Sequence, residues 1–265
     1  MKQRIITAVI AMAVFIPFVY IGGWPLVLFT FLLSAIGLFE LLRMRQIRLF
    51  SLPGIVSLFV IWLWILPQKY AGFFDAVLLS KIEIGLFAVL FYLTYMVASK
   101  NKFTIEDLSF SILSVIYMGV GFLFFIEIRE EAGLWLLVYS LFIIWATDSG
   151  AYFIGRALGK RKLWPEISPN KTVEGAIGGI VCACIVGVLF SIFGNIEWYI
   201  MVFITIILSA FGQIGDLAES ALKRHFHVKD SGNLLPGHGG ILDRFDSLLF
   251  VWPLLYFILA AFNVI

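Results

Sequence analysis

The chain has 265 residues and a formal net charge of +2, and 62% of its residues are hydrophobic whereas only 14% are charged. Soluble domains of this size are nearer half apolar and a quarter charged, so the composition excludes an ordinary soluble fold. The net charge is too small to indicate a nucleic-acid partner. The composition is that of a polytopic α-helical membrane protein.

Uncharged segments long enough to cross a bilayer recur along the chain. The first, residues 5–39, exceeds the length of one span, because a hydrocarbon core of about 30 Å needs only about 20 helical residues. Gly22, Gly23 and Pro25 predict a break inside it. Further segments follow at 49–66, 84–99, 108–126, 132–147, 175–196, 198–215 and 247–265; the one at 84–99 is short and could start as early as Ala76. We therefore predict an all-α protein with about nine transmembrane helices, the first an uncleaved signal anchor.

The placement of basic residues predicts the orientation of these spans. Lys and Arg concentrate in cytoplasmic loops. With a cytoplasmic N-terminus and nine spans, all but three of the 19 basic residues fall on the cytoplasmic side, the exceptions being Lys69, Lys81 and Arg129. This segregation predicts a multi-pass protein of the cytoplasmic membrane with its C-terminus outside. Residues 1–130 are predicted to form a five-span scaffold, and residues 131–265 a four-span catalytic region whose active-site loops face the cytoplasm.

Two polar segments of the second half are candidate sites. On a helix, Asp148 and Tyr152 share a face; the alternative is a packing face on which the acid pairs with Arg156. The segment 167–175 carries Lys171 and Glu174 at the expected start of a helix. A helix N-terminus with a nearby Lys favours a phosphate, although a plain helix start would explain the same residues.

The densest polar segment, residues 215–246, predicts a metal–phosphate site. On a helix, Asp216, Glu219, Ser220 and Lys223 form one stripe, and Asp243 and Asp246 share the start of the next helix. Carboxylates from two helix ends suit Mg²⁺, which leaves coordination positions for substrate phosphates. Further phosphate contacts are expected from the three cations Lys223, Arg224 and Lys229. They are also expected from a glycine-rich loop that contains His238, Gly239 and Gly240. The alternative is a loop of exposed ion pairs.

The same segment resembles a known family. Residues 220–246, SALKRHFHVKDSGNLLPGHGGILDRFD, are similar to the signature of the phosphatidate cytidylyltransferases, or CDP-diacylglycerol synthases, and DSGAY at 148–152 and SPNKTVEG at 168–175 also resemble that family. The resemblance implies transfer of CMP from CTP to phosphatidic acid of the inner leaflet, with Mg²⁺ required. It also suggests potassium as a second cation and is compatible with a homodimer.

These considerations assign roles to individual residues. The predicted metal ligands are Asp216, Asp243 and Asp246, and the other predicted catalytic residues are Lys223, Arg224 and His238. The predicted substrate-binding residues are Asp148, Tyr152, Lys171, Glu174, Glu219, Ser220, Lys229, Gly239, Gly240 and Arg244. Two other functions are compatible with the pattern: a CTP-dependent polyprenol or phytol kinase, which would transfer a phosphoryl group, and an anion transporter. A transporter would place its polar groups near the midplane, whereas here they gather at one predicted surface.

Overall fold

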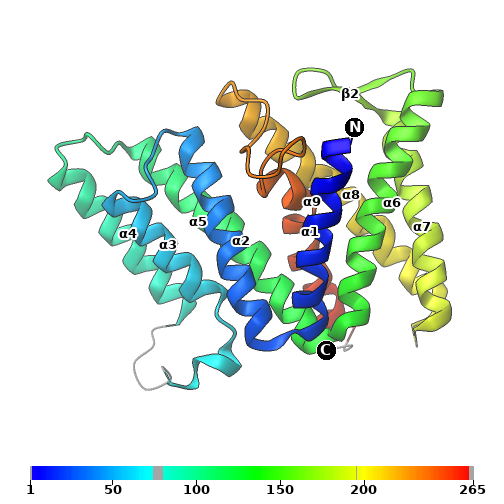
Figure 1. Cartoon of the computed structure of the whole chain (residues 1–265), viewed down its shortest axis with the longest axis horizontal. Coiled ribbons are helices and arrows are strands. Elements are labelled where there is room, and N and C mark those ends of the chain that lie inside the picture. The colour runs from blue at the N-terminus through cyan, green and yellow to red at the C-terminus, as the bar shows by residue number, and fades with distance from the viewer. Residues whose placement is uncertain (1, 74–79, 195, 263–265) are drawn as a thin grey trace. The chain divides into compact units, whose positions relative to one another are not determined.

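The computed structural model describes residues 2–73, 80–194 and 196–262, and it is almost entirely helical (Figure 1). Within these residues, seven helical segments are long and apolar enough to cross a membrane, which is consistent with a polytopic all-α membrane protein. α3 is also apolar but has only 14 residues. At about 1.5 Å per residue it is shorter than a bilayer core of about 30 Å.

Each predicted span falls on a helix, and whether every helix crosses the membrane stays a prediction. α4 begins at Lys81 with a capping box between Ser80 and Glu83, and the possible start at Ala76 lies outside the described residues. The elements are α1 (Lys2–Ile21), α2 (Gly23–Met44), α3 (Leu52–Ile65), η1 (Gln68–Phe73), α4 (Lys81–Ala98), α5 (Ile105–Glu127), η2 (Ile128–Ala132), α6 (Gly133–Leu158), β1 (Lys162–Trp164), β2 (Ser168–Thr172), α7 (Val173–Phe193), α8 (Trp198–His225) and α9 (Leu242–Ala261).

Helical structure continues between α5 and α6, where the sequence predicts two separate spans. The connecting element η2 is a π-helix, and Gly133, which follows it, has a φ of 87°. That value lies in the left-handed region, which glycine adopts readily and other residues do not. The run from Ile105 to Leu158 is therefore not one straight α-helix.

The chain forms two compact units. The first comprises Met1–Glu127 with Val228–Asp243, and the second comprises Ile128–His227 with Arg244–Ile265. The first unit therefore contains a loop from the region predicted to be catalytic. The functional division into a scaffold and a catalytic region stays a prediction.

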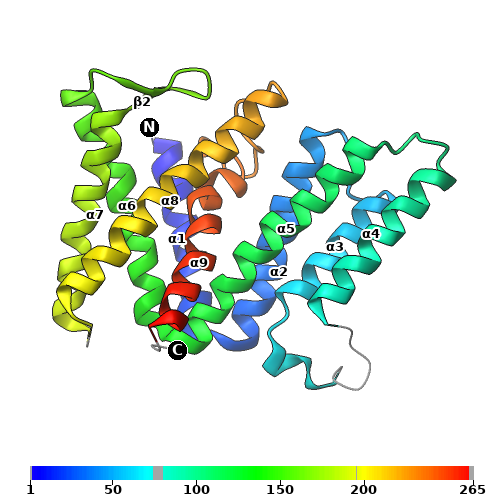
Figure 2. The ribbon, with the colours of Figure 1, turned by 180° about the vertical axis from the view of Figure 1, so that it is seen from behind.

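In the first unit, α5 packs against α2 and α3, and α3 also packs against α4 (Figure 2). The buried hydroxyls of Ser57 on α3 and Tyr92 on α4 lie 2.6 Å apart, so this helix pair is joined by a hydrogen bond. The Arg45 guanidinium, just after α2, donates to Asp107 in the first turn of α5 at 2.7 Å. The end of α2 and the start of α5 therefore lie together, in agreement with their predicted location on the same side of the membrane.

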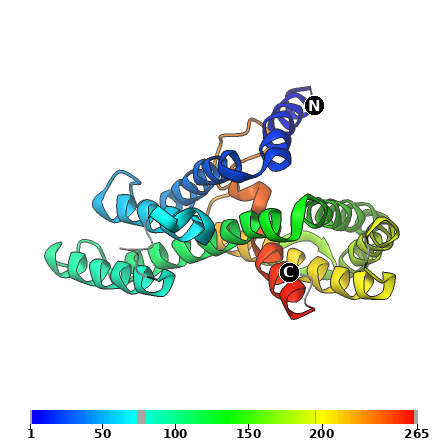
Figure 3. The same ribbon diagram turned by 90° about the horizontal axis from the view of Figure 1, so that it is seen from below.

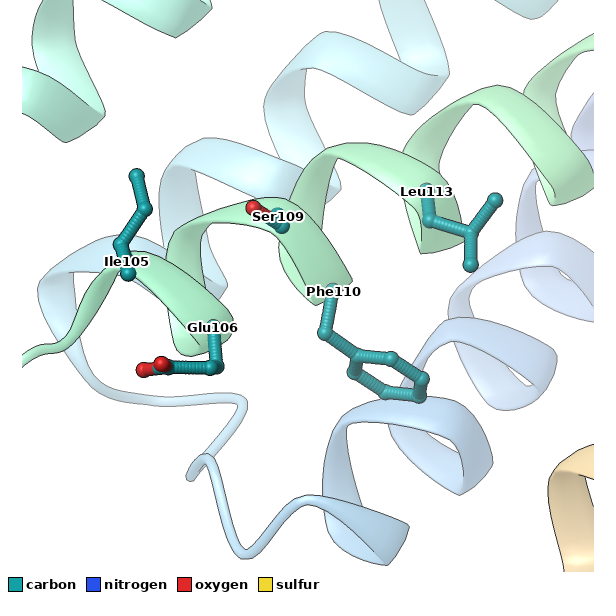
Figure 4. A pocket seen from close by; sticks show the side chains of 5 residues that line it. All are labelled: Ile105, Glu106, Ser109, Phe110 and Leu113. Carbon is teal, nitrogen blue, oxygen red and sulfur yellow. The ribbon is translucent and has the colours of Figure 1, made fainter. Parts of the chain in front are cut away.

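A shallow open pocket of about 320 Å³ lies along the first turns of α5 (Figure 4). It is lined by Ile105, Glu106, Ser109, Phe110 and Leu113. Its lining contains a carboxylate and no cation, which does not suit an anionic nucleotide or lipid phosphate.

In the second unit, α7 packs along α6 through a face of small residues. A Cβ at Gly179 would lie 2.7 Å from the Thr147 carbonyl oxygen, and one at Gly175 would lie 2.7 Å from that of Ala151. Glycine on this face therefore permits a close helix approach, as is common in membrane proteins.

Buried hydrogen bonds join the remaining helices of this unit to α6. The hydroxyls of Thr147 and Ser209 lie 2.7 Å apart between α6 and α8. The Trp252 indole on α9 donates to the Ser140 hydroxyl on α6 at 3.1 Å. Such bonds add directional contacts between helices whose apolar surfaces resemble the surrounding lipid.

A two-stranded antiparallel hairpin interrupts the otherwise helical chain between α6 and α7. β1 pairs with β2 so that Lys162 faces Thr172 and Trp164 faces Ser168. No pattern in the sequence predicted this hairpin. Thr172 caps α7 by accepting the Gly175 N–H at 3.1 Å, so the hairpin leads directly into that helix.

Candidate active site

Three acidic side chains from three helices approach one another in the second unit. Asp148 lies on α6, Asp216 on α8 and Asp246 on α9, and their carboxylates interact electrostatically. Asp216 and Asp246 are half-buried, whereas Asp148 is exposed. We call these three residues the carboxylate cluster. Like charges that influence one another in this way favour compensation by cations.

Close backbone contact between α8 and α9 brings two of these acids together. Gly215 faces the Asp246 carbonyl, and a Cβ at Gly215 would lie 2.7 Å from that oxygen. α9 crosses α8 (Figure 3). Because a side chain at Gly215 would separate the helices, the glycine allows Asp216, the next residue, to lie near Asp246.

Cations from three elements compensate the carboxylate cluster. Lys171 on β2 places its ammonium nitrogen 2.5 Å from Asp216 Oδ2. Asp148 interacts electrostatically with Lys171 and Arg244, and Asp246 interacts with Lys223. The structure therefore brings together predicted metal-binding and substrate-binding residues. All of them come from helix ends or loops predicted to be cytoplasmic.

Several other predicted site residues make contacts within this unit. The fully buried Glu219 forms an ion pair with Lys223, one turn later on α8. Ser220 donates its hydroxyl to Asp216 Oδ1 at 3.3 Å. Glu174 Oε2 accepts the backbone N–H groups of Lys160 at 3.0 Å and Arg161 at 3.2 Å, and thereby ties the hairpin to the start of α7.

Tyr152 and Arg224 lie at the surface of this unit. The Arg156 guanidinium donates to the Tyr152 hydroxyl at 3.4 Å, so the alternative pairing of Arg156 with Asp148 is not the contact that forms. Arg224 Nε donates to the Ile167 carbonyl at 3.3 Å. The end of α8 is thereby joined to the turn of the hairpin.

Asp243 belongs to the first unit, where its carboxylate organises the glycine-rich loop. Its Oδ2 accepts hydrogen bonds from Ser231 N at 2.9 Å and Gly240 N at 2.7 Å, and it lies 2.8 Å from the Ser231 hydroxyl oxygen. The Gly240 N–H, predicted to face an anion, is donated to Asp243 in this structure. Gly239 has a φ of 84°, a left-handed conformation that accounts for glycine at this position.

His238 and Lys229 lie in the same loop. The backbone N–H of His238 donates to the Leu235 carbonyl at 2.8 Å, and its side chain is half-buried. The predicted catalytic role of His238 stays a prediction. Lys229 is exposed.

The carboxylate cluster has the donor chemistry that Mg²⁺ requires. Among the residues that the structure describes, no three His, Cys, Asp or Glu side chains are arranged as a ready set of metal ligands. Mg²⁺ does not need such a set, because it binds through one or two carboxylates and completes its coordination with water and phosphate oxygens. Asp216 and Asp246 fit this requirement, provided that Lys171 shares or releases Asp216.

The sequence match covers nearly the whole chain. Residues 2–262 match the model of the cytidylyltransferase family. The chain belongs to the cytidylyltransferase family.

The curated relatives of this chain have names that are more specific than the family name. The chain is 54% identical to the phosphatidate cytidylyltransferase of Bacillus subtilis (strain 168), with 99% of each chain covered. It is 49% identical to the proteins of the same name from Staphylococcus haemolyticus and Staphylococcus saprophyticus, with 98% of this chain and 99% of each relative covered.

Glu40 is a further candidate functional residue that the motifs of the sequence did not indicate. The residue lies on α2 and is fully buried, and its carboxylate accepts hydrogen bonds from residues 231–242. An acidic residue inside the apolar pattern of α2 is the signal that could have indicated it. The partner segment could not have been identified, because it lies about 200 positions later in the chain.

Proposed function

We propose that the protein transfers CMP from CTP to the phosphate of phosphatidic acid, giving CDP-diacylglycerol and pyrophosphate for phospholipid biosynthesis. The observation that carries this proposal is the similarity, over nearly the full length of both chains, to relatives named phosphatidate cytidylyltransferase. The grouping of acids and cations in the second unit supports a reaction between phosphates.

In the proposed reaction, an oxygen of the lipid phosphate attacks the α-phosphorus of CTP. The new P–O bond forms as the bond to the β-phosphate bridging oxygen breaks, and pyrophosphate leaves. A phosphate monoester has a second pKa of about 6, so the nucleophile is already anionic near neutral pH. A strong general base is therefore unnecessary, and the main task of the protein is to hold two anions together.

The residues of the second unit suit this task. Lys171, Lys223 and Arg244 lie around the carboxylate cluster and would neutralise phosphate oxygens. Asp216 and Asp246 would hold Mg²⁺, which when bound would supply charge neutralisation at the phosphates. Asp243 as a further ligand stays a prediction of its position at the start of α9 and of the family resemblance. Potassium as a second cation and a homodimer stay predictions of the family resemblance alone.

We further propose nine spans in the cell membrane, with the N-terminus and the active site on the cytoplasmic side. The distribution of Lys and Arg supports this orientation. CTP is a cytosolic nucleotide, and the headgroup of phosphatidic acid lies at the bilayer surface. A site at the cytoplasmic helix ends would reach both substrates.

The direct test is to incubate the purified protein in detergent with CTP, phosphatidic acid and Mg²⁺, with an EDTA control. We expect the lipid product to gain the mass of CMP and pyrophosphate to appear in equal amount. A gain of one phosphate would instead identify a lipid kinase. Absence of any lipid product would remove the enzymatic proposal and leave transport to be tested.

Two variants test the assigned residues. Asp216→Asn and Asp243→Asn should each abolish CMP transfer while leaving elution from a size-exclusion column unchanged. Glu106→Gln is the matched control, since it also neutralises an acid but lies at the exposed start of α5. Retention of most activity in an aspartate variant would remove that residue from the site.

A further inference from the structure

Glu40 forms a buried contact between α2 and the glycine-rich loop within the first unit. Its Oε2 accepts the Ser231 hydroxyl at 3.0 Å and the Leu242 N–H at 2.9 Å, and its Oε1 accepts the Ile241 N–H at 2.9 Å. A buried carboxylate without such donors would be strongly destabilising. These three hydrogen bonds account for its presence in an apolar helix.

Ser231 connects Glu40 to Asp243. Its hydroxyl oxygen lies 3.0 Å from Glu40 Oε2 and 2.8 Å from Asp243 Oδ2, so one side chain contacts both carboxylates. The neighbouring backbone N–H groups are divided between the two acids: Gly240 donates to Asp243, whereas Ile241 and Leu242 donate to Glu40. The two carboxylates therefore fix the same segment of backbone. We call Glu40, Ser231 and Asp243 the loop clamp.

The glycines of the loop are explained by this clamp. A Cβ at Gly232 would lie 2.5 Å from Glu40 Oε1, and one at Gly240 would overlap the same oxygen and the Ser231 hydroxyl. Both positions are buried against Glu40. Part of the glycine-rich sequence therefore accommodates Glu40, in addition to any role in approaching a ligand.

We propose that Glu40 is a positioning residue for Asp243: it fixes residues 231–242 so that the Asp243 carboxylate is held in one orientation. This inference rests on the proposed function and on the predicted assignment of Asp243 as a further metal ligand. Groups that hydrogen-bond around metal ligands typically change metal affinity or activity by 10- to 100-fold when they are removed. A packing role alone would not require a carboxylate, because an apolar side chain fills buried space without the desolvation penalty of a charged group.

The first test measures the loop without metal or substrate. In Glu40→Gln, the amide NH₂ replaces one acceptor oxygen and faces a donor of the loop, so the clamp loses at least one hydrogen bond. We expect hydrogen–deuterium exchange at residues 231–242 of the metal-free protein to become about 10-fold faster or more. Unchanged exchange would overturn the proposal.

Thr30→Val is the matched control. Thr30 is fully buried on the same helix, and its hydroxyl donates to the Leu26 carbonyl of α2 itself at 2.8 Å. The substitution removes a buried polar group of similar size and should leave exchange in residues 231–242 unaltered. Equal acceleration in both variants would mean that exchange reports general loosening of the unit, and would overturn the specific role of Glu40.

The second test measures divalent-ion binding directly. Mn²⁺, used as a probe for Mg²⁺, is titrated into the purified protein and followed by electron paramagnetic resonance, and the Mg²⁺ concentration for half-maximal CMP transfer is measured in parallel. In Glu40→Gln we expect Mn²⁺ affinity to fall, and half-saturating Mg²⁺ to rise, about 10- to 100-fold. Faster loop exchange with wild-type ion affinity would overturn the positioning role.

Ser231→Ala keeps the test decisive if Glu40→Gln does not fold. It removes the hydroxyl shared by the two carboxylates and leaves the backbone donors in place, so the same direction of change in exchange and in Mn²⁺ affinity is expected. Wild-type values in a folded Ser231→Ala protein would contradict the clamp. A failure of the proposed function is distinguishable, since it would appear as absence of Mg²⁺-dependent CMP transfer in the wild type.

Discussion

Replacement of Lys171 by Met should change metal binding and nucleotide use in opposite directions. The Lys171 ammonium lies 2.5 Å from Asp216 Oδ2, with side-chain exposures of 26% and 30%. A divalent ion that binds Asp216 must therefore compete with this ammonium. Without the Lys171 ammonium, the metal-free protein should bind a divalent ion more tightly. CTP should be used less efficiently, because it loses a cation that would contact its phosphates.

The magnitude follows from the partial burial of the ion pair. Exposed pairs contribute about 0.2–1 kcal/mol, and two unit charges 4 Å apart interact by about 4 kcal/mol at the effective dielectric of a protein surface. The interaction free energy of a partly buried pair falls between these limits. We take it as about 1–2 kcal/mol, which corresponds to a factor of about 5–30 in a binding constant. Mn²⁺ affinity should rise by that factor, and kcat/KM for CTP should fall at least as much.

The assay is a Mn²⁺ titration of the purified protein, followed by electron paramagnetic resonance, together with initial rates at varied CTP. Lys160→Met is the control, because Lys160 is exposed and its loss changes the net charge equally. Weaker or unchanged Mn²⁺ binding in Lys171→Met, relative to this control, would show that Lys171 does not compete with a metal ion for Asp216.

Three further outcomes are expected from the fold. Glu131 is exposed, and a cysteine there should react with an impermeant reagent added outside the cell; labelling from the cytosol alone would overturn the predicted topology. Gly179→Leu should push a side chain against the Thr147 carbonyl and lower the free energy of unfolding by about 1–3 kcal/mol. The change should appear as a lower melting temperature in detergent, and a wild-type melting temperature would contradict the close α6–α7 packing. Trp252→Phe removes the hydrogen bond to Ser140, worth about 0.6 kcal/mol, and also leaves a cavity at a fully buried site, so it should lower stability by about 1–3 kcal/mol; a wild-type melting temperature in detergent would contradict this packing.

Local patterns were sufficient to predict the helices and most of the residues around the carboxylate cluster. Uncharged segments predict helices because a backbone in lipid must satisfy its own hydrogen bonds. The helical spacing of Asp216 and Ser220 correctly placed both on one face, where a hydrogen bond joins them. The alternative pairing of Asp148 with Arg156 shows the limit of such reasoning, because spacing along a helix does not decide which partner a side chain selects.

Residue types and their spacing along the chain are enough to predict the helical membrane architecture and the chemical character of the site. Tertiary structure alone decided the partners. Lys171 reaches Asp216 from a hairpin that no local pattern indicated, and Glu40 accepts hydrogen bonds from a loop about 200 positions away. The physical reason is that a charge buried in an apolar interior must find compensating groups. Only the packing of distant segments determines which groups are within reach.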